Sequence, residues 1–249
     1  MQNVMTTLVS AICGAMIAVA AVIVMTNAGL MPVNEAQLHG YLVSHPQVLA
    51  EMNDAGQKAE DARSAAAQAA AIKKVGLDAF FNPRIAFVTG PVNAPNTMVE
   101  FYDYDCPYCR ASLPAVKAAF EKHKNDTRFA FIEYPIESLH GPGAVLAARA
   151  SLAARDQPEK FLGFHYLMMG ETEQMTEDMI MADAKKAGLD VKKLQADMNN
   201  PEVANILKDA RDFGKKVELV GTPTFIINGA MYPQAMDDDA IAAAFKKQG

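Results

Sequence analysis

The sequence predicts an α/β domain that follows a helical arm and an apolar N-terminal segment. Two observations indicate the domain. Short β-type runs alternate with helical patterns between residues 97 and 247, and a C-x-x-C motif lies between a strand-like run and a helix-like one. Alternation of this kind is typical of α/β folds. A third observation indicates the N-terminal parts, because residues 1–28 are mostly apolar and residues 29–89 are rich in helix formers.

The composition is that of a protein with a buried core and an acidic surface. The chain has 249 residues, of which 51% are hydrophobic, and its formal net charge is −6. An acidic chain lacks the basic stripe that neutralises phosphates, so we expect no nucleic-acid partner. Three cysteines are too few for a disulfide-rich scaffold. Cys13 stands alone, whereas Cys106 and Cys109 form the C-x-x-C motif.

The first 28 residues are interpreted as a membrane anchor. Residues 4–25 contain no charged side chain, and as a helix they would be about 33 Å long, enough to cross a bilayer core. A cleaved signal peptide is the alternative, with 26–28 as the cleavage region, although the segment lacks a basic start and its apolar run is long. With either interpretation the remaining residues are exported. Cys13 is interpreted as a small apolar residue of this segment.

Residues 29–89 are predicted to form a helical arm and linker. Helices are expected over residues 35–44 and 47–74, separated near Pro46. Apolar residues recur along the second helix at alternating spacings of four and three, as in a coiled coil: Val48, Met52, Ala55, Ala59, Ala62, Ala66 and Ala69. Because most of these seam residues are alanine, each buries little area. The arm is therefore either a weak oligomerisation element or a spacer.

The main domain is expected to span residues 90–249, after a turn-rich segment. Strands are predicted over 97–104, 128–134 and 224–227, with a hairpin at Asn228-Gly229, and helices over 107–123 and 237–247. Residues 138–217 form a mostly helical block between the second and third strands.

The motif Cys106-Pro107-Tyr108-Cys109 is the principal candidate for chemistry. At the start of a helix, free backbone N–H groups and the positive end of the helix dipole would lower the pKa of Cys106. Cys109 lies one turn later on the same side. Cys106 is therefore expected to be the exposed attacking sulfur, and Cys109 the resolving one. Pro107 and Tyr108 would tune ring strain and local solvation.

Other uses of the cysteine pair fit less well. A structural zinc site needs four ligands, and the sequence has no further cysteine outside the N-terminal segment and no histidines at ligand spacing. A purely structural disulfide across two residues would stabilise little, because the closed loop is tiny. The pattern strand, C-x-x-C, helix favours redox chemistry. We therefore expect no metal and no cofactor besides the Cys106–Cys109 disulfide.

Three segments together resemble the DsbA-like thiol–disulfide oxidoreductases, which have a thioredoxin-like fold. Residues 99–109 resemble the active-site segment of that family, and residues 221–229 resemble its cis-proline loop and the following strand. The helical block 138–217 matches the insertion that distinguishes the family from plain thioredoxins. The N-terminal segment and residues 41–49 are similar to the N-terminal extension of a bacterial subgroup that includes the ScsC-like, copper-tolerance-associated proteins.

The resemblance implies roles for individual residues. Pro223 would be the cis-proline that faces the C-x-x-C motif, and Thr222 would present its backbone to an extended client. Glu100 would be a partly buried acid beneath Cys109 that relays its proton. Pro107 and Tyr108 would contact the client. Thr222 is more similar to the residue of the isomerase and reductase branches than to that of dedicated oxidases.

The function that the resemblance implies is disulfide exchange with exported proteins. The chain would act as oxidase or isomerase on unfolded or misfolded clients, with a membrane partner that reoxidises or reduces it, and as a homo-oligomer if the arm associates. It would lie on the periplasmic side of the bacterial inner membrane, anchored there or soluble after cleavage. A copper-handling dithiol chaperone is the alternative.

The remaining candidate residues have simpler interpretations. A group of methionines is interpreted as core filling or an adaptable peptide surface rather than a copper site: Met168, Met169, Met175, Met179 and Met181. His140 is expected in a loop or cap rather than as a base. Tyr102 and Tyr104 are expected to pack within their strand.

Overall fold

The computed structural model describes residues 35–246. The expected anchor or signal segment, including Cys13, lies outside this range. The chain divides into two units, Met1–Asp61 and Ala62–Gly249. Among the described residues, no helix is both long enough and apolar enough to cross a membrane.

The described part of the first unit is helical, as expected. Helix α2 spans Glu35–Ser44, and α3 spans Pro46–Val75 and continues into the second unit. Pro46 is favoured at the first position of α3, where its missing N–H removes no helical hydrogen bond. The coiled-coil seam is largely exposed, and Met52 retains 62% of its accessible surface.

The C-terminal end of α3 belongs to the second unit and packs within it through a different face from the seam. Only Gln68 and Ile72 are fully buried on this helix among the described residues. The Gln68 amide Nε2 donates to the Glu218 carbonyl at 3.4 Å, and Ile72 joins a hydrophobic cluster of the domain. The seam residues Ala66 and Ala69 remain exposed.

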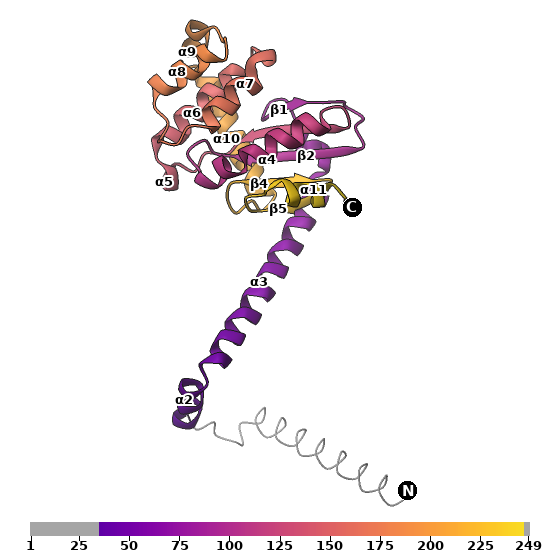
Figure 1. Ribbon diagram of the computed structural model, residues 1–249, viewed down its shortest axis with the longest axis vertical. Helices are drawn as coiled ribbons and strands as arrows, with labels where there is room; N and C mark the ends of the chain where they lie inside the picture. Colours follow the sequence, from indigo (N-terminus) through magenta and orange to yellow (C-terminus); the bar gives the residue numbers. More distant parts are fainter. Residues whose placement is uncertain (1–34, 247–249) are drawn as a thin grey trace, which may run out of the picture. The chain divides into compact units, whose positions relative to one another are not determined.

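The second unit is built on a five-stranded sheet with the strand order β1-β3-β2-β4-β5. Strands β2 and β3 run parallel, and the other neighbouring pairs are antiparallel. The strands are β1 (Ala86–Thr89), β2 (Asn96–Tyr102), β3 (Thr127–Glu133), β4 (Thr224–Ile227) and β5 (Ala230–Tyr232). Figure 1 shows helices covering the sheet, with the helices between residues 137 and 198 gathered at one end of the unit.

Strand β1 was not expected from the sequence. It lies before residue 90, where the main domain was expected to begin, and follows a short 3-10 helix, η1 (Leu77–Phe81). It has only four residues and pairs along one edge with β3. A strand this short carries no clear periodicity of its own, and its pairing with a distant segment defines it. The sheet therefore includes part of the segment that we assigned to the linker.

Strand β2 ends two residues earlier than predicted. The Asp103 carboxylate atom Oδ1 accepts a hydrogen bond from the backbone N–H of Asp105 at 2.9 Å. An aspartate that bonds to the backbone two residues later forms a tight turn. This turn ends the strand at Tyr102 and directs the chain into the next helix.

That helix, α4 (Pro107–His123), agrees with the prediction and packs against the last helix, α11 (Asp238–Lys246). The expected helical insertion is also present. Its helices are α5 (Glu137–His140), α6 (Pro142–Ala154), α7 (Pro158–Met169), α8 (Glu177–Lys186), α9 (Val191–Met198) and α10 (Pro201–Lys216). Proline begins α6, α7 and α10, at positions where its missing N–H costs no helical bond.

The sheet separates two hydrophobic clusters. Met98 and Tyr102 of β2 belong to the larger cluster, with both cysteines, whereas Val99 and Phe101 belong to the smaller one. Because side chains alternate along a strand, Glu100 shares the face of Met98 and Tyr102. The methionines singled out in the sequence lie in the larger cluster or pack against it, which confirms their interpretation as core filling.

Candidate active site

The C-x-x-C motif lies where the turn after β2 enters α4. Cys106 is the residue just before the helix and Pro107 is its first residue. The backbone N–H of Cys106 donates to the Asp103 carbonyl at 3.1 Å, and that of Cys109 donates to the Cys106 carbonyl at 3.1 Å. The predicted placement of Cys106 at a helix N-terminus is confirmed.

The surroundings of Cys106 favour its thiolate. Hydrogen bonding from the Cys109 thiol is the largest cause that lowers the pKa of Cys106 to about 6, from an ordinary value of 9.0. Backbone hydrogen bonds of Cys109 and Tyr108 and a side-chain bond of Thr222 act in the same direction, while burial opposes them. Cys106 is therefore mostly a thiolate at neutral pH, the reactive form in disulfide exchange.

The expectation that Cys106 is exposed is wrong. The residue keeps only 2% of its accessible surface, and both Cys106 and Cys109 are free thiols. The Cys106 sulfur lies 3.2 Å from the Thr222 carbonyl oxygen, to which the protonated thiol donates. The segment around Thr222 thus closes over the sulfur, a tertiary contact between residues that are 116 positions apart in the sequence.

Cys109 has the opposite character. Burial, then the hydrogen bond and charge of Cys106, and then Glu100 raise the pKa of Cys109 well above its ordinary value. Cys109 therefore remains a thiol when Cys106 is ionised.

Glu100 lies in the core on the sheet face that carries the larger cluster. It keeps 3% of its accessible surface, and its atom Oε2 has no hydrogen-bond partner among the described residues. Burial, followed by the nearby charge of Glu133, raises the pKa of Glu100 to about 8. The side chain is thus mostly protonated at neutral pH, and it is more deeply buried than the sequence led us to expect.

The expected client-binding residues largely meet beside the cysteines. The Thr222–Pro223 peptide bond is cis, as the resemblance implied. An open pocket of about 470 Å³ adjoins it and carries no charged side chain; its lining residues are Tyr108, Thr222, Pro223, Pro233, Gln234 and Ala235. Tyr108 is 66% exposed at this pocket. Pro107 is exposed but does not line it.

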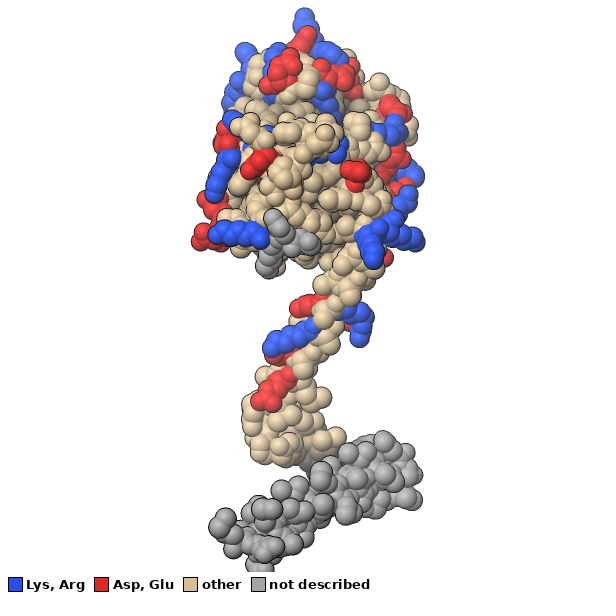
Figure 2. All heavy atoms as spheres, turned by 90° about the vertical axis from the view of Figure 1, so that its right-hand side faces the viewer, with Lys and Arg blue, Asp and Glu red and all other residues tan. Residues whose placement is uncertain are grey.

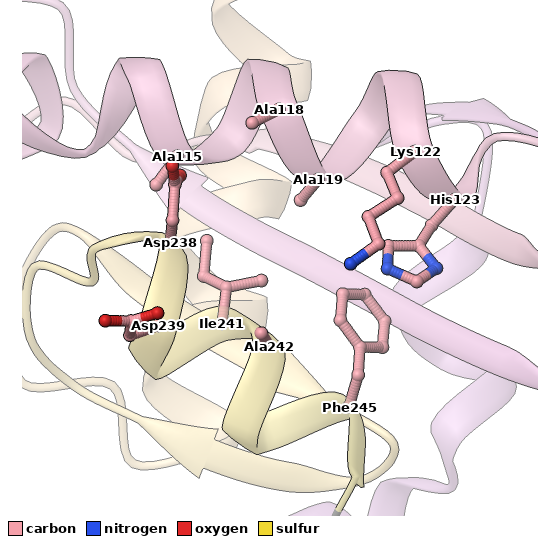
Figure 3. A pocket seen from close by; sticks show the side chains of 10 residues that line it. All are labelled: Ala115, Ala118, Ala119, Lys122, His123, Asp238, Asp239, Ile241, Ala242 and Phe245. Carbon is pink, nitrogen blue, oxygen red and sulfur yellow. The ribbon is translucent and has the colours of Figure 1, made fainter.

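A second pocket lies away from the cysteines, between α4 and α11. It has a volume of about 240 Å³, and Figure 3 shows Lys122 and His123 at the end of α4 opposite Phe245. The His123 and Phe245 rings stack with their centroids 4.7 Å apart. Neither cysteine lines this pocket, so it does not belong to the site described above.

The turn before the cysteines is held by a residue pair that we did not predict. The Asp103 carboxylate atom Oδ2 accepts from the Ile136 backbone N–H at 2.7 Å and lies 2.7 Å from His140 Nδ1. His140 is the last residue of α5 and Gly141 is the residue that caps it, so the expectation that His140 lies in a loop or caps a helix is wrong. Two aspartates directly before the cysteines, in the sequence DYDC, were the only signal for this arrangement.

A buried polar network adjoins Glu100, and the sequence did not predict it. The Tyr102 hydroxyl donates to Glu133, and the Tyr104 hydroxyl donates to Ser151 at 2.9 Å and lies 2.9 Å from His165 Nδ1. Burial raises the pKa of Glu133 to about 8 and lowers that of His165 to about 3. The expected packing of Tyr102 and Tyr104 is confirmed, although Tyr104 lies beyond the end of the strand.

No cluster of three or more acidic, histidine or cysteine side chains suited to a metal ion occurs within residues 35–246. On the face shown in Figure 2, acidic and basic side chains are interspersed around a largely uncharged centre.

Comparison with known proteins identifies the family and the fold of the second unit. A family model described as thioredoxin matches residues 85–247. A thioredoxin-like oxidoreductase from Silicibacter pomeroyi DSS-3 is 34% identical, with a TM-score of 0.61 over 69% of this chain and 96% of its own. Proteus mirabilis ScsC in a transitional conformation is 26% identical, with a TM-score of 0.60 over 85% of this chain and 91% of its own.

One curated relative has a name that agrees with this assignment, and another is matched over only a small part of its length. Disulfide bond formation protein D of Bacillus subtilis is 26% identical over 171 residues, which are 65% of this chain and 76% of that protein. The match to a Na⁺/H⁺ antiporter NhaA of Salinispora tropica is 29% identical over 63% of this chain, but it spans only 24% of the antiporter's length.

Thioredoxin-like proteins carry out their redox chemistry through a C-x-x-C cysteine pair, without a separate cofactor. Cys106 and Cys109 occupy the corresponding place between β2 and α4. Since the family model covers more than half of the chain, we conclude that this protein belongs to the thioredoxin family and that its relatives include DsbA-like and ScsC-like thiol–disulfide oxidoreductases.

Proposed function

We propose that the chain is an exported thiol–disulfide oxidoreductase that exchanges disulfides with protein clients through Cys106 and Cys109. The observation that carries this proposal is the contrast between the two thiols, because the pKa of Cys106 is lowered to about 6 and that of Cys109 is raised. A sulfur with a low pKa is a good leaving group, and the stabilised thiolate favours the reduced form of the pair. This contrast favours donation of a disulfide to clients.

The reaction proceeds in two exchanges. A client thiolate attacks Cys106 Sγ of the oxidised pair, a mixed disulfide forms, and Cys109 leaves and receives a proton from Glu100. A second client thiolate then attacks the client sulfur of the mixed disulfide, and Cys106 leaves as a thiolate. Two electrons have passed from the client to the cysteine pair. The reverse sequence reduces a client disulfide, and the two directions together rearrange wrong disulfides.

The pocket beside Pro223 receives the client. An extended peptide pairs with the backbone at Thr222, as strands add to exposed backbone in other complexes. The exposed ring of Tyr108 and the uncharged lining of the pocket suit apolar segments, which unfolded exported proteins present. Access to Cys106 requires a small displacement of the segment around Thr222, because that segment covers the sulfur.

Export and anchoring rest on the uncharged run of residues 4–25. The chain then acts on the periplasmic side of the inner membrane, either anchored or released by cleavage. A membrane redox partner restores the oxidised or the reduced state of the cysteine pair after each cycle.

The arm associates with further copies of itself. Apolar side chains stand exposed along α2 and the first part of α3: Leu38, Tyr41, Val43, Leu49 and Met52. Burying these side chains in an oligomer would remove their apolar surface from water, and this would stabilise the oligomer. Several active sites around one client would suit isomerisation.

Light scattering of residues 29–249 and 62–249 tests the arm, because the shorter chain keeps Gln68 and Ile72 in place. We expect an oligomer for the longer chain and a monomer for the shorter. Monomers in both cases would leave the arm as a spacer.

Trapping experiments test the reaction itself. Cys109→Ser should accumulate mixed disulfides with clients, whereas Cys106→Ser should trap none, and the opposite pattern would reverse our assignment of the two sulfurs.

A ribonuclease assay distinguishes the possible activities. Oxidation of reduced ribonuclease would indicate an oxidase, and recovery of scrambled ribonuclease would indicate an isomerase. A protein that did neither, and that bound copper(I) through the two thiols, would be the alternative dithiol chaperone.

A further inference from the structure

Arg110, the residue after the C-x-x-C motif, joins the active-site turn to the helical insertion. Its guanidinium donates from Nε to the Tyr104 carbonyl at 2.8 Å and from Nη1 to the Thr172 carbonyl at 3.0 Å. The third nitrogen, Nη2, donates to the Glu173 carbonyl at 2.7 Å and to Asp105 Oδ1 at 2.9 Å. The planar fork of arginine suits such a set of fixed acceptors.

Asp105, the carboxylate paired with Arg110, directly precedes Cys106. Its side chain keeps only 3% of its accessible surface. The same oxygen that accepts from Arg110 also accepts the Met175 backbone N–H at 2.8 Å. Arg110 and Asp105 together therefore fasten residues 172–175, between α7 and α8, to the turn that carries the nucleophile.

A buried carboxylate beside a thiolate has an electrostatic consequence. Two negative charges at adjacent residues repel, and the repulsion is weakly screened where water is excluded. Arg110 neutralises Asp105, and Asp103 and His140 are the other charged or titratable groups that act on this carboxylate. Without the guanidinium, the Asp105 charge would oppose the ionisation of Cys106.

We propose that Arg110 is a positioning residue that sets the redox poise of Cys106 by neutralising Asp105, and that the carbonyls of Thr172 and Glu173 fix its guanidinium in place for this role. This inference rests on the proposed role of Cys106 as the nucleophile. It adds that the helical insertion contributes to the oxidising power of the cysteine pair, through one arginine.

The test is a charge cycle that uses Arg110→Met, Asp105→Asn and the double variant. Each full-length protein is equilibrated at pH 8 with glutathione, in the reaction protein disulfide + 2 GSH ⇌ protein dithiol + GSSG. In Arg110→Met the unpaired carboxylate destabilises the thiolate, so the equilibrium constant should fall, on the order of threefold to tenfold. In Asp105→Asn it should rise. The Cys106 thiolate absorbance should titrate at higher pH in the first variant and at lower pH in the second.

The double variant separates charge from packing. It lacks every hydrogen bond of the guanidinium, yet its two charges are removed together, so the equilibrium constant should return to within about twofold of the wild-type value. Arg110→Lys keeps the charge and should stay closer to wild type than Arg110→Met. Arg84→Met is the matched control, because Arg84 pairs with Glu202 and Asp209 on the surface.

The experiment distinguishes failure of the proposed function from failure of the role proposed for Arg110. If the wild-type protein shows no redox equilibrium with glutathione, the proposed function fails. If the wild type behaves as expected but Arg110→Met leaves the constant unchanged, or the double variant is at least as impaired as Arg110→Met, the positioning role of Arg110 is overturned.

Discussion

Cys106 and Cys109 carry the same functional group, and their immediate neighbours give the two thiols opposite acidities. Cys106 receives hydrogen bonds at the start of α4, whereas Cys109 lies in the core beside protonated Glu100. Ionisation at one sulfur and retention of a proton at the other are what the two steps of disulfide exchange require. Two substitutions test this arrangement.

Thr222→Val should raise the pKa of Cys106 above its present value of about 6, because the Thr222 side chain lowers that pKa and valine keeps its shape without the hydroxyl. We expect a rise of at most about one to two units, since a single hydrogen bond to a charged group is worth about 1.5–3 kcal/mol. Thiolate absorbance near 240 nm measures the shift. Thr222→Ser keeps the hydroxyl and should change little; an unchanged pKa in Thr222→Val would show that the hydroxyl does not act on Cys106.

Glu100→Gln should slow the step in which Cys109 attacks or leaves. The amide has nearly the same shape but cannot exchange a proton with Cys109, and general acid–base groups typically contribute about 10²-fold or more. Stopped-flow measurement of mixed-disulfide resolution gives the rate. Glu121→Gln, at an exposed acid of α4, the helix that carries Cys109, is the control. Equal resolution rates in both variants would remove Glu100 from the mechanism.

At the scale of elements, α6 is packed directly beneath the active-site turn. A Cβ atom at Gly143 would lie 2.5 Å from the Met175 carbonyl oxygen and 2.7 Å from Asp105 Oδ2. Both distances are far below van der Waals contact, so this position of α6 accepts only glycine. The insertion and the C-x-x-C turn therefore form one packed unit.

Gly143→Ala should destabilise the protein by about 1–3 kcal/mol, the usual cost of forcing an extra group into a packed site. Gly163, in α7, provides the control because a Cβ atom there meets nothing within 4 Å. Gly163→Ala should stabilise the protein by about 0.5–1 kcal/mol, since alanine is the better helix former. Urea denaturation monitored by circular dichroism measures both. A neutral effect of Gly143→Ala would mean that the insertion moves away easily.

At the scale of the whole molecule, the core holds ionisable groups in their neutral forms. The pKa values of Glu100 and Glu133 are raised to about 8, and that of His165 is lowered to about 3, in each case mainly by burial. The folded glutamates therefore keep protons that unfolded glutamates lose above about pH 4.5. The folded histidine lacks a proton that an unfolded histidine binds below about pH 6.5.

The unfolding free energy of the oxidised protein should be greatest near pH 4.5 to 5, because two buried glutamates outweigh one buried histidine at higher pH. Above an ordinary carboxyl pKa of 4.5, unfolded glutamates ionise while Glu100 and Glu133 keep their protons up to about pH 8, so stability falls as the pH rises. Below the ordinary histidine value of 6.5, the unfolded chain protonates a histidine that His165 in the core does not, so the contribution of His165 to stability falls as the pH drops towards 3.

Denaturation of the oxidised form between pH 4 and 8.5 measures this profile, with an expected loss of about 2 kcal/mol or more from pH 5.5 to 8. Glu133→Gln should flatten the alkaline side. A profile that rises towards pH 8 in the wild type would contradict the neutral state of these carboxyls.

Local signals in the sequence were sufficient to locate the elements that hold the cysteines. Pro107 marks the first residue of α4, and the predicted helix 107–123 and strand 224–227 agree with the structure. The resemblance added the cis bond before Pro223 and the buried acid Glu100, both of which the structure contains. These features depend on neighbouring residues or on a recognisable motif, so a single sequence determines them.

Tertiary structure alone decided the electrostatics of the site and the extent of the sheet. Strand β1 exists through its pairing with β3. Cys106 is covered by Thr222, which is 116 positions away, and Arg110 reaches Thr172 across 62 positions. The proton affinities of Glu100 and Glu133 follow from burial on one face of two adjacent strands. Burial and charge pairing are sums over neighbours in space, and residues distant in the sequence supply those neighbours only after the chain has folded.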